Sequence, residues 1–149
     1  MTSQQPSRAP ALDPDDLVDT LVQAAFMTMA VLSKVGADHD LSLTQLRVLA
    51  ILRDRRPRMT ALADFLGLEK STMSGLVDRA ERRGLMERVP SAGDGRAVDV
   101  ILSAAGTELA ESLYVIIGQA LAPMTDELGP AEQRRLQTLL KRMLRPQEG

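Results

Sequence analysis

The chain of 149 residues contains no cysteine and only 2% aromatic residues, and these absences narrow the classes of protein to consider. Without cysteine, disulfides, thiolate metal sites and a thiol redox switch are excluded. The single histidine, His39, lies between two aspartates, and we interpret it as a loop residue in preference to a metal ligand. No nucleophile, base or metal constellation is evident, so we predict a protein that is not an enzyme and uses no cofactor.

The sequence also lacks a signal-peptide pattern and a long uninterrupted apolar run. The most apolar stretch, from Leu17 to Val35, is broken by polar residues at positions 19, 23, 28, 33 and 34. We therefore predict a cytoplasmic protein with no membrane partner. A hydrophobic share of 44% and a charged share of 26% are ordinary for a globular chain, and the length predicts one domain.

Charge is unevenly distributed along the chain, although the net charge is only −2. Between Arg53 and Arg96 there are ten lysines and arginines against seven acidic residues, which gives +3. The remainder holds the other eight basic and thirteen acidic residues, out of totals of 18 and 20, which gives −5. The positive charge is therefore concentrated in one segment, which favours an anionic partner for that segment.

The centre of that segment predicts a helix with two different faces. Its apolar residues recur at i, i+3, i+4 and i+7 and must face a core: Met73, Leu76, Val77 and Ala80. The outer face and its flanks are small and hydroxylated at first and cationic later: Ser71, Thr72, Ser74, Gly75, Asp78, Arg79 and Arg82. Such a face suits insertion between the phosphate walls of DNA. We expect Asp78 and Arg82 to form an ion pair across one turn.

A shorter helix precedes this one. The pattern predicts it over residues 60–66, with Thr60 as its N-cap and Gly67 as its end. Its apolar residues are expected to pack on the same core: Leu62, Phe65 and Leu66. Two helices in this order, the second with a polar outer face, are typical of a helix-turn-helix, and DNA is therefore the first partner to consider.

A hairpin follows the second helix, which Gly84 closes as a C-terminal cap. Residues 85–89 and 97–102 are short segments rich in apolar and β-branched residues, and between them lies a six-residue loop over 91–96 with two glycines. Arg96 lies where the loop rejoins the second strand, from which an arginine can reach a minor groove. We expect the Asp94 carboxylate to orient the Arg96 guanidinium through a charged hydrogen bond.

The first part of the chain serves another purpose. Residues 1–12 form a polar tail that we expect to be disordered. Asp13 and Pro14 then form an N-cap and first-turn pair that opens a helix to about Val35. This helix is apolar nearly all round, which is more surface than one small domain can bury. We therefore expect a second subunit to cover it.

Three further helices are predicted from the residues that begin them. Ser42 and Gln45 form a capping box. The inner residues of the helix they open are expected to be Leu46, Leu49, Ala50, Ile51 and Leu52. Ser103 caps a long helix, and the pair formed by Gly129 and Pro130 begins the last one.

The predicted fold is mainly α with a small β-hairpin wing, in one domain over residues 13–149. Residues 42–102 form a winged helix-turn-helix lobe, and helices over 13–36 and 103–145 form a dimerisation layer. Helices from both ends of the chain flank the winged motif, and this arrangement indicates a homodimer.

Several runs of residues together resemble the MarR family of transcriptional regulators. These runs are Leu43–Leu49, Leu62–Leu68, Lys70–Arg79, Arg83–Leu85, Gly93–Arg96 and Leu102–Ser103. The resemblance covers about residues 14–144. It implies a homodimer whose two winged lobes bind an inverted-repeat DNA operator, which we expect to act as a repressor. It also implies small effectors, often phenolic or aromatic acids, bound between the lobe and the dimerisation helices.

The candidate site residues follow from the pattern and from the resemblance. Candidate DNA contacts are Lys70, Ser71, Thr72, Ser74, Gly75, Arg79, Arg83, Asp94 and Arg96. The resemblance places the small and hydroxylated residues at the groove, with Arg96 as the wing arginine and Asp94 as its partner. Arg79 and Arg83 are expected to touch phosphate. Candidate effector contacts are Phe26, Arg47 and Tyr114, with the arginine meeting a carboxylate; packing is the alternative role of each.

Some alternatives stay open at this point. Glu69 replaces the more usual Asp or Ser cap before the second helix, so we expect that helix to be capped less well. Gly75 costs the helix roughly 1 kcal/mol relative to alanine, and it either admits a close backbone approach to DNA or is simply tolerated. The alternative function is a winged-helix module that binds protein without specific DNA binding. Such a module needs an exposed apolar face on the second helix, and here that face is polar.

Overall fold

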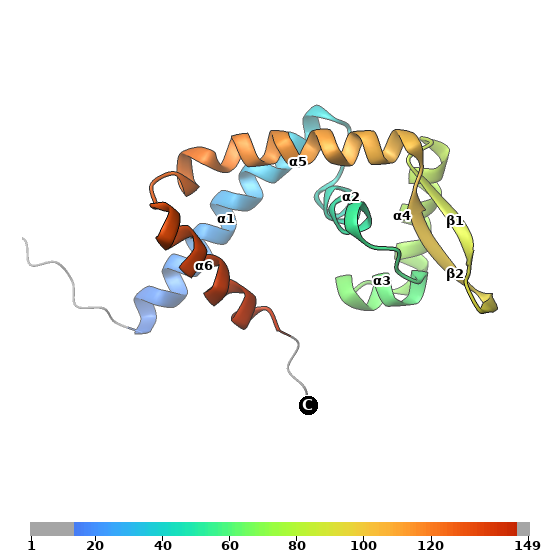
Figure 1. Ribbon diagram of the computed structural model, residues 1–149, viewed down its shortest axis with the longest axis horizontal. Helices are drawn as coiled ribbons and strands as arrows, with labels where there is room; N and C mark the ends of the chain where they lie inside the picture. Colours follow the sequence, from blue (N-terminus) through green and yellow to red (C-terminus); the bar gives the residue numbers. More distant parts are fainter. Residues whose placement is uncertain (1–13, 146–149) are drawn as a thin grey trace, which may run out of the picture.

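The computed structural model describes residues 14–145, which run through four helices, a hairpin and two more helices (Figure 1). They are α1 (Pro14–Asp38), α2 (Leu43–Asp54), α3 (Met59–Leu66), α4 (Lys70–Arg82), β1 (Met86–Ser91), β2 (Asp94–Leu102), α5 (Ala104–Thr125) and α6 (Pro130–Met143). The prediction of a mainly α fold with one hairpin is confirmed. The predicted tail and the N-cap at Asp13 lie outside the described residues.

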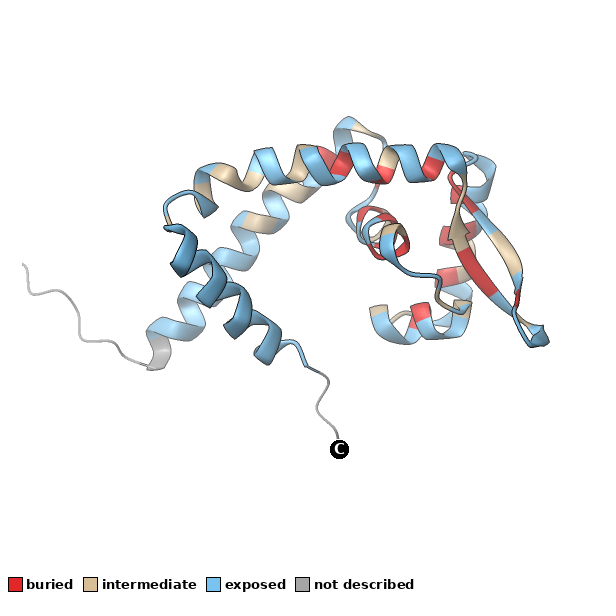
Figure 2. Cartoon of the chain, viewed as in Figure 1, coloured by how far each residue is buried: buried red, intermediate tan, exposed pale blue. Residues whose placement is uncertain are grey.

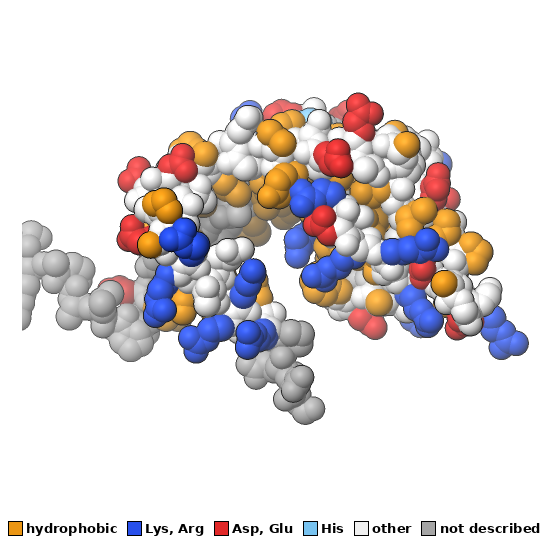
Figure 3. Space-filling model, viewed as in Figure 1, with side chains coloured by type: hydrophobic (Ala, Val, Ile, Leu, Met, Phe, Trp, Pro, Cys, Tyr) orange, Lys and Arg blue, Asp and Glu red, His pale blue; other side chains and the backbone are white. Residues whose placement is uncertain are grey.

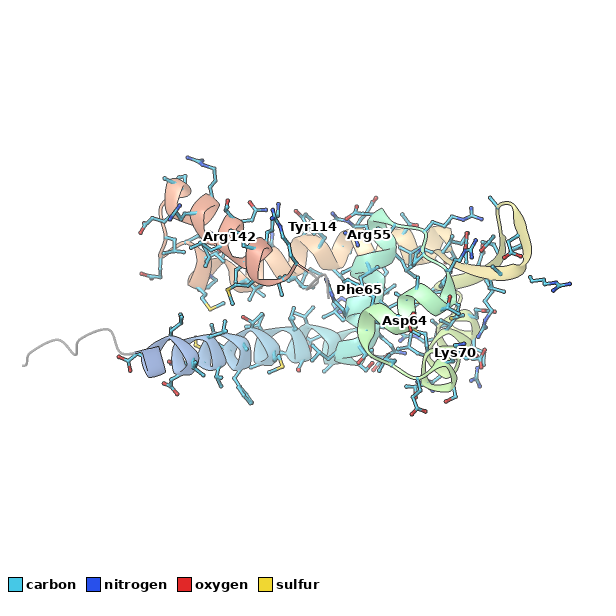
Figure 4. The ribbon with its side chains drawn as sticks, turned by 90° about the horizontal axis from the view of Figure 1, so that it is seen from below. Arg55, Asp64, Phe65, Lys70, Tyr114 and Arg142 are labelled. Carbon is cyan, nitrogen blue, oxygen red and sulfur yellow. The ribbon has the colours of Figure 1, made fainter. Side chains whose placement is uncertain are left out.

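The helices and the hairpin separate into two parts (Figure 1). Residues 43–102, from α2 to β2, form a lobe, and the first turns of α5 pack on it. Helices α1 and α5 lie side by side and extend away from this lobe, and α6 follows at the far end of α5 (Figure 4). Helix α1 ends at Asp38, three residues beyond the predicted end at Val35.

The hydrophobic core lies in the lobe, where most of the buried residues of Figure 2 are found. The predicted inner stripe of α4 is confirmed, because all four of its residues are buried. The largest fully buried side chains come from four elements: Val48, Leu49, Leu62, Met73, Val77 and Val100. This shared core fixes α4 against α2, α3 and β2, which leaves the opposite face of α4 at the surface.

Two core predictions for α2 and α3 are wrong. Ala50 is exposed and Val48 is fully buried in its place. Helix α2 turns Val48 toward the core of the lobe, whereas Ala50 lies on the side toward α5 and α1. Phe65 is 58% exposed, and its ring lies 5.9 Å from the Arg47 guanidinium. The short helix α3 turns only Leu62 and Ala63 fully inward.

The helix caps confirm most of the predicted starts. The Ser42 hydroxyl accepts from the Gln45 amide, and the Gln45 side chain accepts from the Ser42 amide, so the capping box is present. Glu69 makes no side-chain cap, as expected. Thr60 is not the N-cap of α3, since the helix begins one residue earlier. Arg58 occupies the cap position in extended backbone, because it forms a bridge with Asp99 of β2.

The wing is the hairpin of β1 and β2, and it is longer and tighter than predicted. The strands pair in antiparallel register from Met86 opposite Leu102 to Ser91 opposite Asp94, with an irregularity after Pro90. Only Ala92 and Gly93 connect them, so the predicted six-residue loop is wrong. Gly93 has φ +80°, a conformation that glycine adopts without strain, and this allows the tight turn.

The start of α5 is fixed to the end of α4. The Ser103 hydroxyl accepts from the Gly106 amide, which confirms Ser103 as the cap, and donates to the Gly84 carbonyl at 2.6 Å. A Cβ added at Gly106 would lie 1.9 Å from the Leu85 carbonyl oxygen, so no larger residue fits there. The long helix therefore leaves the lobe in a defined direction.

Helices α1 and α6 are largely uncovered (Figure 2). Leu17 is 72% exposed and Phe26 is 66% exposed, and no residue of α6 is buried. By length and composition alone, the part of α1 from Asp16 to Asp38 would also suffice to cross a membrane, with a mean hydropathy of 1.3. Exposed apolar surface of this extent marks a site that binds another molecule.

Candidate nucleic-acid interface and cavity

The outer face of α4 presents the predicted polar residues to solvent. Ser71, Thr72 and Arg79 are exposed, and Ser74 and Gly75 are half-buried. A Cβ added at Gly75 would meet only the Arg79 guanidinium, at 3.5 Å, so packing within the chain does not require a glycine there. Figure 4 shows Lys70 at the first turn of the same helix. The face is therefore free of apolar groups and open to a polar partner.

Arg88 of β1 packs across this face of α4 and contacts its acidic residues. Its guanidinium pairs with Asp78 at 2.8 Å and with Glu81 at 2.5 Å. Burial opposes the charge of Arg88, but the hydrogen bonds to these carboxylates outweigh it and hold its pKa above the ordinary arginine value. The predicted pair between Asp78 and Arg82 is therefore wrong. Arg82 reaches only the Asp78 carbonyl, at 3.4 Å.

A cleft of about 470 Å³ separates the wing from α3 and α4. We call it the wing cleft; its polar lining consists of Arg58, Thr60, Ser74, Arg88, Asp94 and Arg96. Three guanidinium groups thus gather at one hollow, where Lys and Arg side chains are prominent on the lower side of the lobe (Figure 3). The sequence placed Arg58 only in a basic loop. Its position at the cleft depends on the bridge to Asp99.

Asp94 and Arg96 lie together at the tip of the wing, but not as predicted. The Asp94 carboxylate accepts from the backbone amide of Arg96 at 3.1 Å. This bond shapes the turn and does not orient the Arg96 guanidinium. The Arg96 side chain is exposed, and it makes no ion pair among the described residues.

The base of the wing is tied to the segment between α2 and α3. Asp99 is buried, and its carboxylate accepts from the Ser91 hydroxyl and, at 3.0 Å, from Arg56. The hydrogen bond from Ser91, which has the largest effect, and the one from Arg56 hold the pKa of Asp99 below its usual range. The Val100 amide also donates to the Pro57 carbonyl at 3.0 Å. The segment before α3 thus adds to the wing almost as a third strand.

Arg83 holds the C-terminal end of α4 against the turn between α1 and α2. Its guanidinium donates to the carbonyls of Asp40 at 2.6 Å and His39 at 3.1 Å. The structure thus gives this exposed side chain a structural role, and its phosphate contact stays a prediction.

A second, larger cavity of about 980 Å³ opens between α2, α3, α5 and α1. Most of its lining is apolar, from residues such as Leu46, Leu66 and Leu113. Of the three candidate effector contacts, Arg47 and Tyr114 line this cavity and Phe26 does not. Phe26 lies on the exposed part of α1, so the structure does not bring it together with the other two.

The polar rim of this cavity contains a second arginine that sequence reasoning missed. Arg53 lies over the Tyr114 ring, with its guanidinium carbon 3.9 Å from the ring centroid. A hydrogen bond to Asp54 raises the pKa of Arg53 above the ordinary arginine value. Arg53 follows Ala50 by three residues on α2, and this helical spacing was the available signal. The cavity therefore joins apolar walls to two guanidinium groups.

Comparison with known proteins agrees with this geometry. A sequence model of the MarR family matches residues 39–97. The transcriptional repressor NicR of Pseudomonas putida is 28% identical over 145 residues, which span 93% of this chain and 92% of NicR. The multiple antibiotic resistance protein MarR of Escherichia coli is 31% identical over 84 residues, 56% of this chain and 58% of that protein. The chain is thus similar to transcriptional regulators of the MarR family.

Solved structures of MarR-family proteins show the same fold as this chain. Apo MarR of Escherichia coli has a TM-score of 0.69 at 24% identity, covering 91% of this chain and 99% of that one. NadR in complex with 4-hydroxyphenylacetate has a TM-score of 0.76 at 20% identity, covering 97% and 99%. The chain thus has the winged helix-turn-helix fold of these proteins. The relatives that match its sequence are transcriptional regulators, not enzymes, and this supports DNA binding by the chain.

Proposed function

We propose that this regulator is a homodimer that represses transcription by binding an inverted-repeat operator, and that a small aromatic or lipophilic effector releases it. The observation that carries the proposal is the outer face of α4, which is polar along its whole length and borders a cleft walled by arginines. In such a dimer the two α4 helices enter successive major grooves. The half-sites then lie about one helical turn, ~10 bp, apart.

The contacts within one half-site follow from where the side chains lie. Ser71, Thr72 and Ser74 are hydroxylated residues on the first turns of α4, and we assign them to base edges. Gly75 admits the backbone of α4 close to the bases. Cations contact phosphate or a minor groove around them: Arg58, Lys70, Arg79 and Arg96. Asp94 supports these contacts by shaping the wing turn.

The second subunit is proposed as the cover of α1, α5 and α6. The exposed apolar residues of α6 lie at i, i+3, i+4 and i+7 and form one face: Leu136, Leu139, Leu140 and Met143. Beside that face α6 is basic, with Arg134, Arg135, Lys141 and Arg142, whereas α1 begins with exposed Asp16 and Asp19. Opposite charges at the ends of two apolar helices favour their association across a dimer axis. A dimer would cover α1 without a membrane, which is consistent with the cytoplasmic location that we propose.

The larger cavity is proposed as the effector site. Its volume of about 980 Å³ is ample for a small aromatic molecule, and its apolar walls favour one. Arg47 and Arg53 on the rim supply partners for a carboxylate, and Tyr114 supplies an aromatic face. The complex of NadR with 4-hydroxyphenylacetate supports this chemistry in a protein of the same fold. An effector that prefers another lobe spacing would weaken DNA binding by its ratio of affinities for the two states.

The decisive experiment is selection of bound fragments from the genomic DNA of the source organism, sequenced at moderate salt. We expect a pseudo-palindrome, and the affinity should fall steeply as salt rises because phosphate contacts release counterions. Insertion of about half a helical turn, ~5 bp, between the half-sites should abolish specific binding. Indifference to that insertion would contradict the docking geometry. A folded protein that binds no DNA would instead favour the protein-binding module.

The oligomeric state is tested separately by analytical ultracentrifugation of the intact chain at low micromolar concentration. We expect only dimer, because the apolar residues of α1 and α6 are otherwise exposed to water. Leu17→Asp together with Leu140→Asp should dissociate it, whereas Arg96→Ala at the wing should leave it dimeric. A stable folded monomer of the intact chain would rule out the obligate dimer.

A further inference from the structure

Arg88 connects the wing to the outer face of α4 through several hydrogen bonds. Its Nη2 donates to the backbone oxygen and the Oγ of Ser74, both at 3.1 Å, and pairs with Asp78 at 2.8 Å. Its Nη1 pairs with Glu81 at 2.5 Å. The Arg88 side chain is only 27% exposed. The guanidinium of Arg88 is therefore already paired within the chain and is not available to a DNA phosphate.

The contact with Ser74 limits what the serine hydroxyl can do. A hydroxyl has one proton to donate and two lone pairs with which to accept. Arg88 engages one lone pair of Ser74, and its positive charge lies 3.1 Å from the same oxygen. Among the described residues, the Ser74 hydroxyl donates to no acceptor. Its proton is thus left for a partner outside the chain, and the side chain lines the wing cleft.

We propose that Arg88 is a positioning residue that makes Ser74 a hydrogen-bond donor toward the bases. This inference rests on the proposed function, in which α4 enters the major groove. A nearby cation disfavours the approach of the amino groups of adenine and cytosine. Guanine presents two acceptors, O6 and N7, and thymine presents O4. Adenine also presents an acceptor, N7, but it lies beside the amino group, so guanine and thymine are favoured. Arg88 thereby selects guanine or thymine at one position of the half-site without touching a base.

The two carboxylates complete the arrangement. Asp78 contacts the same Nη2 that bonds Ser74, and Glu81 contacts Nη1, so charge-assisted bonds fix the orientation of the guanidinium. In return, the single positive charge of Arg88 offsets one of the two negative charges of this cluster. Arg82 lies on the same helix but reaches only a backbone oxygen at 3.4 Å, which makes it a matched control.

The test measures base preference, not only affinity. Once an operator is selected, each base pair of one half-site is varied, and binding is compared for the intact chain, Ser74→Ala, Arg88→Met and the double variant. Each single change should reduce the preference for guanine or thymine at the same base pair by about threefold to tenfold, the value of one hydrogen bond. The double variant should lose no more than either single one. Arg82→Met should keep the preference.

Arg88→Lys guards against a folding defect, since it keeps the charge but offers one ammonium group that cannot reach Ser74 and both carboxylates at once. Thermal unfolding identifies which variants are folded. A folded Arg88→Lys or Arg88→Met protein with unchanged base preference overturns the inference. So does an Arg88→Met effect that spreads over all base pairs or persists fully in the Ser74→Ala background. Failure of the proposed function looks different, because then the intact chain has no preferred half-site.

Discussion

Replacing Gly75 by alanine should make the protein more stable and a poorer DNA binder. Gly75 lies inside α4 on its outer face, where glycine costs backbone entropy. The added methyl group would meet only the Arg79 guanidinium at 3.5 Å, an ordinary van der Waals distance, and that side chain can move. The folded state therefore accommodates alanine without strain, and the gain in helix propensity is retained.

The magnitudes follow from these contacts. Alanine is favoured over glycine in a helix interior by about 1 kcal/mol, which raises the Tm of a chain of this size by about 2–4 °C. On the DNA side, the methyl group occupies the space into which a base edge would come. One displaced base contact costs about 1–3 kcal/mol, so we expect at least about a fivefold loss of operator affinity.

The assay compares thermal unfolding, at one protein concentration, with operator binding at one salt concentration. Gly118→Ala in α5 is the matched control, because its added Cβ has no neighbour within 4 Å and lies away from α4. It should raise stability similarly and leave operator affinity unchanged. A less stable Gly75→Ala protein would refute the packing argument. A more stable variant with full operator affinity would show that Gly75 is merely tolerated.

Three further predictions concern the wing and the cavity. Asp99→Asn should lower stability at neutral pH. Because the pKa of Asp99 is lowered, the difference from the intact chain should begin to shrink below about pH 4 and vanish only below the lowered pKa of the folded state, as checked by denaturant titrations across pH. Arg96→Ala should weaken binding to every DNA sequence alike, by about tenfold, and lower the salt slope by about one, seen in fluorescence anisotropy. Arg47→Ala should blunt the release of DNA by salicylate-like acids while operator affinity stays near normal, and Phe26→Ala, outside the cavity, should not; equal effects of both variants would remove the cavity from the mechanism.

Much of the fold could be predicted from the sequence because its determinants are local. The inner stripe of α4 follows from a spacing of three and four residues, and it fixes which face of that helix is free. The caps at Ser42 and Ser103 lie three residues from the groups they bond, so they mark helix starts without knowledge of the fold. The outer face of α4 is the complement of these local patterns. For that reason the sequence placed the candidate residues of α4 on the face that the structure leaves at the surface.

The tertiary structure decided which partner each charged side chain takes. Asp78 had an arginine one turn away, yet it pairs with Arg88 of the wing, because the packing of β1 on α4 brings that guanidinium closer. Arg56 and Asp99 are 43 residues apart and meet only once the segment before α3 joins the wing. A long flexible side chain pairs with whatever the fold places within its reach. Sequence spacing records only its nearest neighbours on the same element.

The cavity shows the same division. The sequence placed Phe26, Arg47 and Tyr114 on three helices and could not say how these helices are rotated relative to one another. The structure turns Arg47 and Tyr114 toward a common space and leaves Phe26 on an exposed face of α1. Helical periodicity fixes which residues share a face. Which faces meet is set by the packing of whole helices, a property of the folded chain.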